Sequence, residues 1–170
     1  EWISSIFEYY SEIGRDQKGR VVAPVTSRSI SMVVKESYGV VGCIVPWNYP
    51  LLLMAWKVAP ALASGNTVVI KPSEYTPLSI MHWLQVACDH LPAGIINMIT
   101  GDGVTGSYLV EHPDTRVIAF TGSVDTGKKI ALMAAKQLKK TSLELGGNDP
   151  IIICDDVDLE IAARGTTWGG

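Results

Sequence analysis

The sequence predicts an α/β protein with a doubly wound, mostly parallel sheet and helices on both faces. Short runs that are apolar throughout alternate with segments of helical periodicity, as expected for parallel strands that helices cover on both sides. Hydrophobic residues make up 47% of the 170 positions and charged residues 18%, a balance that can fill a core and that argues against disorder.

The first elements are predicted by apolar spacing and by β-branched residues. Residues 1–13 carry apolar side chains at helical spacing and end at Gly14, which predicts an amphipathic helix. Two strands are expected at 30–35 and 40–45, because both runs are rich in valine and isoleucine and Gly39 marks a turn between them.

The rest of the chain repeats a helix and strand rhythm. Pro50 and Pro77 stand near helix starts, and Gly65 and Gly94 close helices. Asp158 begins a last helix, because carboxylates favour a helix amino end. Further helices are expected at 51–64, 77–90, 104–111 and 125–138, and strands at 67–70, 95–99, 117–120, 142–145 and 151–154.

Composition excludes several classes of protein. The 14 basic and 17 acidic residues give a formal charge of −3 and no basic stripe, so nucleic acid is not an expected partner. No apolar run approaches the roughly 20 residues of a membrane helix. Cys43, Cys88 and Cys154 are too widely spaced for a zinc site or a disulfide framework, and no metal site is expected. We interpret these cysteines as reduced core thiols of a cytoplasmic protein.

Ligands of such sheets bind beyond the carboxyl ends of the strands, so the loops after strands are the candidate sites. One is Gly101–Gly106, a literal G-x-G-x-x-G between a strand and a helix. The acidic residue expected about 20 positions later is missing, since the next strand ends in Phe120, Thr121 and Gly122. A glycine-rich helix start explains the motif at least as well.

The loop 120–127 is small and polar, and it also precedes a helix. A helix amino end with the Ser123 hydroxyl suits an anion, and Lys128 and Lys129 in the first turn favour phosphate, although they also fit a solvated face. In Lys71-Pro72-Ser73-Glu74, the cation and the carboxylate could bracket the hydroxyls of a ribose or form a surface ion pair.

Two residues suit acid–base or oxyanion chemistry. Glu144 lies between leucines, and partial burial there would suit a general base, whereas the alternative is an exposed residue on an edge strand. Asn48, between Pro46-Trp47 and Tyr49-Pro50, offers a fixed amide donor for an oxyanion, whereas the alternative is an Asx turn.

In this order along the chain, the motifs resemble the aldehyde dehydrogenase superfamily. They are Pro46-Trp47-Asn48-Tyr49-Pro50, Lys57 in a helix, Lys71-Pro72-Ser73-Glu74, Phe120-Thr121-Gly122-Ser123 with Gly127, and Leu143-Glu144-Leu145-Gly146-Gly147. The resemblance covers essentially the whole chain and implies a Rossmann-like cofactor domain. It also implies NAD(P)-dependent oxidation of an aldehyde to a carboxylic acid through a cysteine thiohemiacetal and a thioester.

The resemblance assigns roles to these positions. Glu144 is similar to the base of the family, Asn48 to its oxyanion donor, and Lys57 to a lysine of its charge relay. Lys71 and Glu74 are similar to the residues that contact the adenosine ribose, and Pro72 and Ser73 lie in the same turn. Gly122, Ser123 and Gly127 are similar to the pyrophosphate loop. Trp47 and the adjacent Pro46 correspond to the nicotinamide side, and Leu145 is a further cofactor-binding position. Glu74 favours NAD over NADP, because a carboxylate repels a 2′-phosphate. In this family the loop 101–106 is a helix start.

Two departures limit the resemblance. Asn148-Asp149 replaces the lysine that many members carry after the glycine pair, and none of the three cysteines matches the family's nucleophile. We therefore expect an internal fragment: 1–145 as a cofactor domain without its amino-terminal part, and 146–170 as the truncated start of a catalytic domain. The nucleophile would lie beyond residue 170, in a homo-oligomeric parent protein.

Two other functions remain open on the sequence. The chain could be a non-catalytic nucleotide-binding or assembly module that keeps the dehydrogenase fold. It could also be a classical Rossmann reductase that binds its cofactor through Gly101–Gly106.

Overall fold

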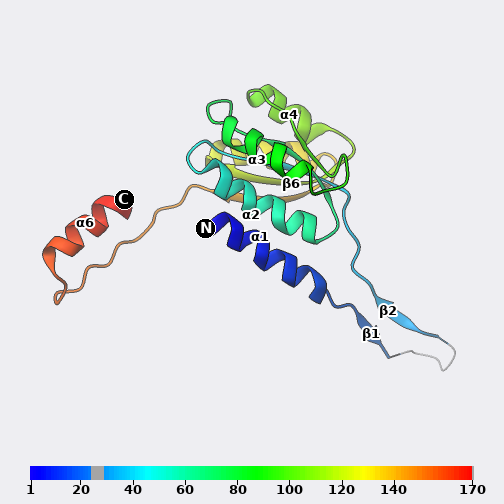
Figure 1. Ribbon diagram of the computed structural model, residues 1–170, viewed down its shortest axis with the longest axis horizontal. Coiled ribbons are helices and arrows are strands. Elements are labelled where there is room, and N and C mark those ends of the chain that lie inside the picture. The colour runs from blue at the N-terminus through cyan, green and yellow to red at the C-terminus, as the bar shows by residue number, and fades with distance from the viewer. Residues whose placement is uncertain (24–28, 170) are drawn as a thin grey trace.

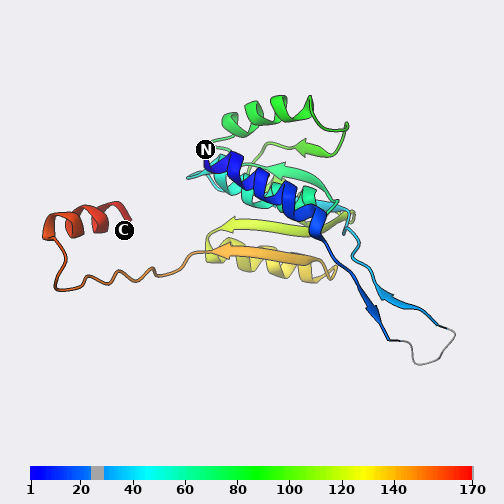
Figure 2. The ribbon, with the colours of Figure 1, turned by 60° about the horizontal axis from the view of Figure 1, so that its bottom comes forward.

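A computed structural model of the chain describes residues 1–23 and 29–169, and it confirms the predicted α/β fold. Five parallel strands form one sheet in the order β5-β4-β3-β6-β7. The strands are β3 (Val40–Ile44), β4 (Thr67–Lys71), β5 (Ile96–Met98), β6 (Thr115–Gly122) and β7 (Lys140–Leu145). The arrows of this sheet that are visible in Figure 2 point the same way, so the carboxyl ends of its strands share one edge.

The helices between these strands cover both faces. The helix α2 (Pro50–Ala63) and the helix α3 (Leu78–Cys88) follow β3 and β4, whereas α4 (Gly103–Glu111) and α5 (Val124–Ala135) lead into β6 and β7 (Figure 1). The chain therefore winds outward from β3 in one direction and from β6 in the other, as a doubly wound sheet requires.

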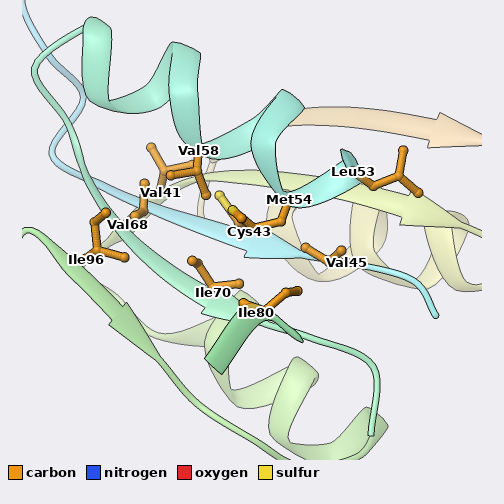
Figure 3. Close-up of a cluster of buried hydrophobic side chains, with 10 residues drawn as sticks. All are labelled: Val41, Cys43, Val45, Leu53, Met54, Val58, Val68, Ile70, Ile80 and Ile96. Atoms are coloured by element: carbon orange, nitrogen blue, oxygen red, sulfur yellow. The ribbon is translucent and has the colours of Figure 1, made fainter. Parts of the chain in front are cut away.

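Alternating residues of the strands supply two cores, one for each face. On one face Cys43 of β3 and Ile70 of β4 pack against Met54 of α2, in the cluster that Figure 3 shows. On the other face Ile118 and Phe120 of β6 pack with residues of α4 and α5. This alternation places consecutive residues of β6 on opposite faces of the sheet.

The elements before the sheet include a hairpin that the sequence predicts only in part. The amphipathic helix is present as α1 (Trp2–Ile13), which packs on α2 and leads into the short 3₁₀ helix η1 (Gly14–Asp16). The expected strand at 30–35 is β2 (Ser31–Val33), but it pairs antiparallel with β1 (Arg20–Val22), which the sequence did not predict. Figure 1 shows this hairpin extending away from the sheet.

The strand expected at 151–154 is wrong. These residues have no regular structure and are exposed, although they are apolar. They belong to the segment that follows β7 and leads away from the sheet, so no described strand pairs with them (Figure 2). The last expected helix is present as α6 (Leu159–Gly169), where Asp158 Oδ1 accepts the N–H groups of Glu160 and Ile161.

The interpretation of all three cysteines as core thiols is also wrong in part. All three are free, but only Cys43 is buried, while Cys88 at the end of α3 and Cys154 are exposed. Among the described residues, no helix is long and apolar enough to cross a membrane.

Candidate active site

A cleft of about 850 Å³ lies at the carboxyl ends of β3, β4 and β6, where the two halves of the sheet wind apart. This position is where open α/β sheets bind their ligands, and the volume lies within the range of small-molecule and cofactor sites. It brings together seven of the residues that the sequence proposes for a cofactor: Pro46, Trp47, Lys71, Ser73, Glu74, Gly122 and Ser123.

Lys71 and Glu74 form a polar rim on this cleft. Lys71 is the last residue of β4, and its buried side chain places Nζ 3.5 Å from Glu74 Oε2, whereas Glu74 is partly exposed. The turn between them is held locally, because the Ser73 hydroxyl accepts the N–H of Tyr75. Pro72 is buried behind this rim and does not line the cleft.

The start of α5 forms another wall of the cleft. Ser123 caps this helix by accepting the N–H of Thr126, and its carbonyl accepts the N–H of Gly127. Within the described part of the chain, the N–H groups of Val124 and Asp125 have no hydrogen-bond partner. A neutral cap with two free N–H groups leaves this helix end open to an anion. Lys129 lines the cleft one turn later, whereas Lys128 does not.

Two of the proposed cofactor residues pack against each other instead of lining the cleft. A Cβ atom added to Gly127 would lie 2.4 Å from Leu145 Cδ2, so the absence of a side chain lets α5 approach β7. Gly122 does line the cleft, and a Cβ there would lie 2.5 Å from the ring of Phe120. Packing against neighbouring side chains therefore explains why both positions are glycine, whether or not a ligand binds there.

The loop Gly101–Gly106 is the start of a helix. Asp102 caps α4, and its Oδ1 accepts the N–H groups of Val104 at 2.9 Å and Thr105 at 3.4 Å. This carboxylate occupies the helix end that a pyrophosphate would need, which argues against a classical fingerprint. Gly103 and Gly106 still line the cleft, from the side of the helix.

A chain of hydrogen bonds joins α2, β6 and β7 beside the cleft. Lys57 Nζ donates to Thr121 Oγ1 at 2.5 Å, and Thr121 Oγ1 donates to Glu144 Oε2 at 2.9 Å. Lys57 Nζ and Glu144 Oε2 lie 3.8 Å apart. Thr121 also lines the cleft, so it is the residue that the cleft and the hydrogen-bonded chain share. Sequence reasoning quoted Thr121 only as part of a motif and missed this role.

Burial is distributed unequally along this chain of hydrogen bonds. The Lys57 side chain is 6% exposed, and burial lowers the pKa of its ammonium, an effect that the nearby Glu144 carboxylate partly offsets. The Glu144 side chain is 54% exposed. Of the two alternatives for Glu144, the structure has the exposed residue on an edge strand, because β7 is the last strand of the sheet and no helix of the described residues covers this carboxylate.

Asn48 is exposed on the loop after β3 and does not line the cleft. Its Oδ1 accepts the N–H of Tyr49 at 3.0 Å, which is a contact with the next residue and not the bond two residues on that defines an Asx turn, because Pro50 has no N–H to donate. Its amide nitrogen has no partner among the described residues and so keeps both hydrogens available for donation. The adjacent Trp47 is held through its carbonyl, which accepts from the Thr76 hydroxyl.

None of the three cysteines lines the cleft. Burial raises the pKa of Cys43 to about 12, an effect that Lys57 opposes, so this thiol is not ionised near neutral pH.

Comparison with known proteins identifies this arrangement. The model of the aldehyde dehydrogenase family matches residues 2–170. Betaine aldehyde dehydrogenase 1 of Oryza sativa subsp. japonica is 45% identical over 99% of this chain, and the mitochondrial succinate-semialdehyde dehydrogenase of Arabidopsis thaliana is 46% identical over 96%. These matches cover 34% and 31% of the two relatives, so this chain spans about a third of their length.

A solved structure agrees with these relatives. The crystal structure of betaine aldehyde dehydrogenase from Staphylococcus aureus in complex with NAD+ superposes with a TM-score of 0.92 at 40% identity. The superposition covers 99% of this chain and 34% of that one. The order of motifs, the doubly wound sheet and these matches agree, and the chain belongs to the aldehyde dehydrogenase family.

Proposed function

We propose that this chain is a segment of an NAD(P)-dependent aldehyde dehydrogenase that oxidises an aldehyde to a carboxylic acid. The observation that carries the proposal is the meeting of two features at Thr121: a cleft that fits a dinucleotide, and the hydrogen-bonded chain that ends at the Glu144 carboxylate. The family match supports the reaction class.

The cleft residues fit NAD on physical grounds. Lys71 and Glu74 offer a donor and an acceptor at one rim, suited to the two hydroxyls of a ribose. Ser123 and the free N–H groups at the start of α5 suit the pyrophosphate. We propose NAD as the preferred cofactor, because the Glu74 carboxylate would repel the 2′-phosphate of NADP. Bound NAD would supply the acceptor for the hydride of the substrate.

The residues of this chain would act on protons and on the oxyanion. Glu144 would accept the proton of the nucleophilic thiol and later that of the hydrolytic water, and Asn48 would donate its amide N–H groups to the developing oxyanion. Lys57 would hold positive charge near Glu144. We propose that the cysteine that forms the thiohemiacetal and thioester lies outside residues 1–170, which the burial of Cys43 supports.

The remaining expectations are proposals of the same kind. Residues 1–145 would form the cofactor domain, and 146–170 would begin the catalytic domain, which the extended segment after β7 supports. A homo-oligomeric parent protein and a cytoplasmic location stay predictions. The free cysteines suit a reducing compartment, although several relatives are named as peroxisomal or mitochondrial proteins.

The test uses the complete protein that contains these residues. We expect it to form NADH when an aldehyde such as betaine aldehyde, an aminoaldehyde or succinate semialdehyde is added. Glu144→Gln should lower kcat by about 10²- to 10⁴-fold, because it removes the proton acceptor. The dissociation constant for NAD, measured by calorimetry, should stay unchanged.

Other outcomes would contradict this proposal. NAD binding without turnover of any aldehyde would favour a non-catalytic nucleotide-binding module. An unchanged kcat in Glu144→Gln would remove Glu144 from the base role. The exposed Glu111 of α4 offers a matched control, and Glu111→Gln should keep the activity of the unaltered protein.

A further inference from the structure

Within the described residues, the carboxylate of the proposed base lies on an exposed edge of the sheet, where packing alone does not fix its orientation. Glu144 belongs to the edge strand β7, and its side chain is 54% exposed. A side chain of this length samples several rotamers in water, and the loss of that freedom costs free energy. Something in the protein must therefore hold the carboxylate if it is to take protons at a defined point.

The register of the sheet places one hydroxyl group beside Glu144. Thr121 of β6 and Glu144 of β7 are register partners in the parallel ladder. Thr121 Oγ1 lies 2.9 Å from Glu144 Oε2, whereas Lys57 Nζ lies 3.8 Å from the same oxygen. The longer separation is beyond ordinary hydrogen-bond range, so the hydroxyl is the link between the cation and the carboxylate.

The donors and acceptors give this link one direction. An ammonium group has only donors, so Thr121 Oγ1 must accept from Lys57. Its one hydroxyl proton is then left for Glu144 Oε2, which accepts as a carboxylate. The buried position of Lys57 on α2 fixes the first bond and thereby orients the second.

From this geometry we infer that Thr121 is a positioning residue: its hydroxyl, oriented by Lys57, holds the Glu144 carboxylate at the edge of the cofactor cleft. The inference rests on the proposed function for its catalytic consequence, but the positioning itself is a property of this chain. Because Thr121 also lines the cleft, the held carboxylate stays next to the space that a cofactor would fill.

The test compares two substitutions at one position in the complete enzyme. Thr121→Val keeps the β-branched shape but removes the hydroxyl, and we expect it to lower kcat by about 10- to 100-fold, as misplaced catalytic groups do. Thr121→Ser keeps the hydroxyl and should stay within about 3-fold of the unaltered enzyme. Thr121→Val also takes the hydroxyl partner from the buried Lys57 ammonium, so its melting temperature should fall, whereas that of Thr121→Ser should stay close to the unaltered enzyme; kcat is therefore compared well below both melting temperatures and at saturating NAD.

A double-mutant cycle separates positioning from a general loss of structure. In a Glu144→Gln background, Thr121→Val should cause little further loss of kcat, because the group it orients is already gone. Thr141→Val, at an exposed threonine of the adjacent strand β7, is the matched control and should leave kcat unchanged. Additive losses in the cycle, or equal losses in Thr121→Val and Thr121→Ser, would overturn the inference.

NMR spectroscopy of the 170-residue chain tests the positioning of Glu144 without depending on enzyme activity. We expect the side-chain carboxyl carbon resonance of Glu144 and the Nζ resonance of Lys57 to move in Thr121→Val and to stay in place in Thr121→Ser. If they do so while the complete protein oxidises no aldehyde, the proposed function fails and the positioning holds. If neither resonance moves in Thr121→Val, the positioning role is refuted whatever the activity.

Discussion

Lys57 carries a charged ammonium group in a buried position, which is unusual for a lysine. Its ammonium group is buried under α2 with Thr121 and Glu144 as its polar neighbours, and the Cys43 thiol also lies close enough to interact with it. Burial is the main cause that lowers its pKa below 10.5, and the Glu144 carboxylate opposes the shift. A buried cation destabilises the fold unless its partners compensate for the lost water.

The lowered pKa of Lys57 predicts a pH dependence of stability. Between the pKa of the folded chain and 10.5, the unfolded chain binds more protons at this site, so the free energy of unfolding rises with pH there. Below that interval both states are protonated and the cost of burying the charge is fully present. Lys57→Met removes this pH-dependent part of the free energy of unfolding. The stability of the variant relative to the unaltered chain should therefore fall as the pH rises through the interval.

Urea unfolding from neutral pH to about pH 10 measures this difference. Lys128→Met replaces an exposed lysine of α5 and is the control, for which the difference should not vary in this way. A difference that stays constant over the alkaline range for Lys57→Met would show that the lysine is not desolvated in the folded chain.

At the scale of elements, α4 and α5 begin at the same end of the sheet but differ in their caps. Asp102 closes the first with a carboxylate, and Ser123 leaves the second open with a neutral hydroxyl. We expect Asp102→Ala and Ser123→Ala each to destabilise the chain by about 1 kcal/mol through the lost cap. Only Ser123→Ala should also weaken NAD binding.

Thermal unfolding and calorimetric titration with NAD measure these two effects on the same samples. Asp102→Asn keeps a capping side chain without the charge and serves as the control for stability. Loss of NAD binding in Asp102→Ala with unchanged binding in Ser123→Ala would restore the fingerprint interpretation of Gly101–Gly106.

Among the elements, the buried strands and the cleft were predictable from the sequence, whereas properties that depend on strand order and pairing were not. The strands β4 and β6 were predictable, with the shorter bounds 67–70 and 117–120, because strands buried on both faces are apolar throughout. The cleft was predictable because its residues follow such strands. The sequence left open whether Glu144 is partly buried or exposed, since the answer depends on the order of strands in the sheet. The apolar run 151–154 indicates burial against something, but it does not say that a strand will pair with it.

Thr121 shows why site residues can be missed. Its role depends on the register between β6 and β7, which brings together residues that are 23 positions apart in the sequence. A single hydroxyl in a small, polar loop has no pattern of its own. The one sequence signal for Thr121 is its place at the carboxyl end of a predicted strand, where ligands of such sheets bind.

At the scale of the whole molecule, the proposed boundary between the cofactor domain and the start of a second domain lies at the end of β7. Residues 146–154 have no regular structure, residues 155–157 form a turn, and all of 146–158 are exposed. Figures 1 and 2 show α6 standing apart from the sheet. In limited proteolysis of the 170-residue chain, we therefore expect the first cuts in 146–158, leaving a resistant fragment that ends near residue 145. Mass spectrometry identifies the cut sites.

Added NAD provides the control for this digestion. It should protect the loops around the cleft without protecting 146–158. First cuts within α2 or α5 would contradict the division into a cofactor domain and the start of a second domain.

The central position of β3 has a consequence for folding kinetics. β3 pairs with β4, which follows after one helix, and also with β6, whose residue Thr115 pairs with Val40 across 75 positions of chain. Closing such a long loop costs more entropy than the local pairing and slows folding. Since the cleft lies between these two strands, it forms only when β6 docks on β3. The refolding step that docks β6 on β3 is then also the step at which the proposed NAD site first forms.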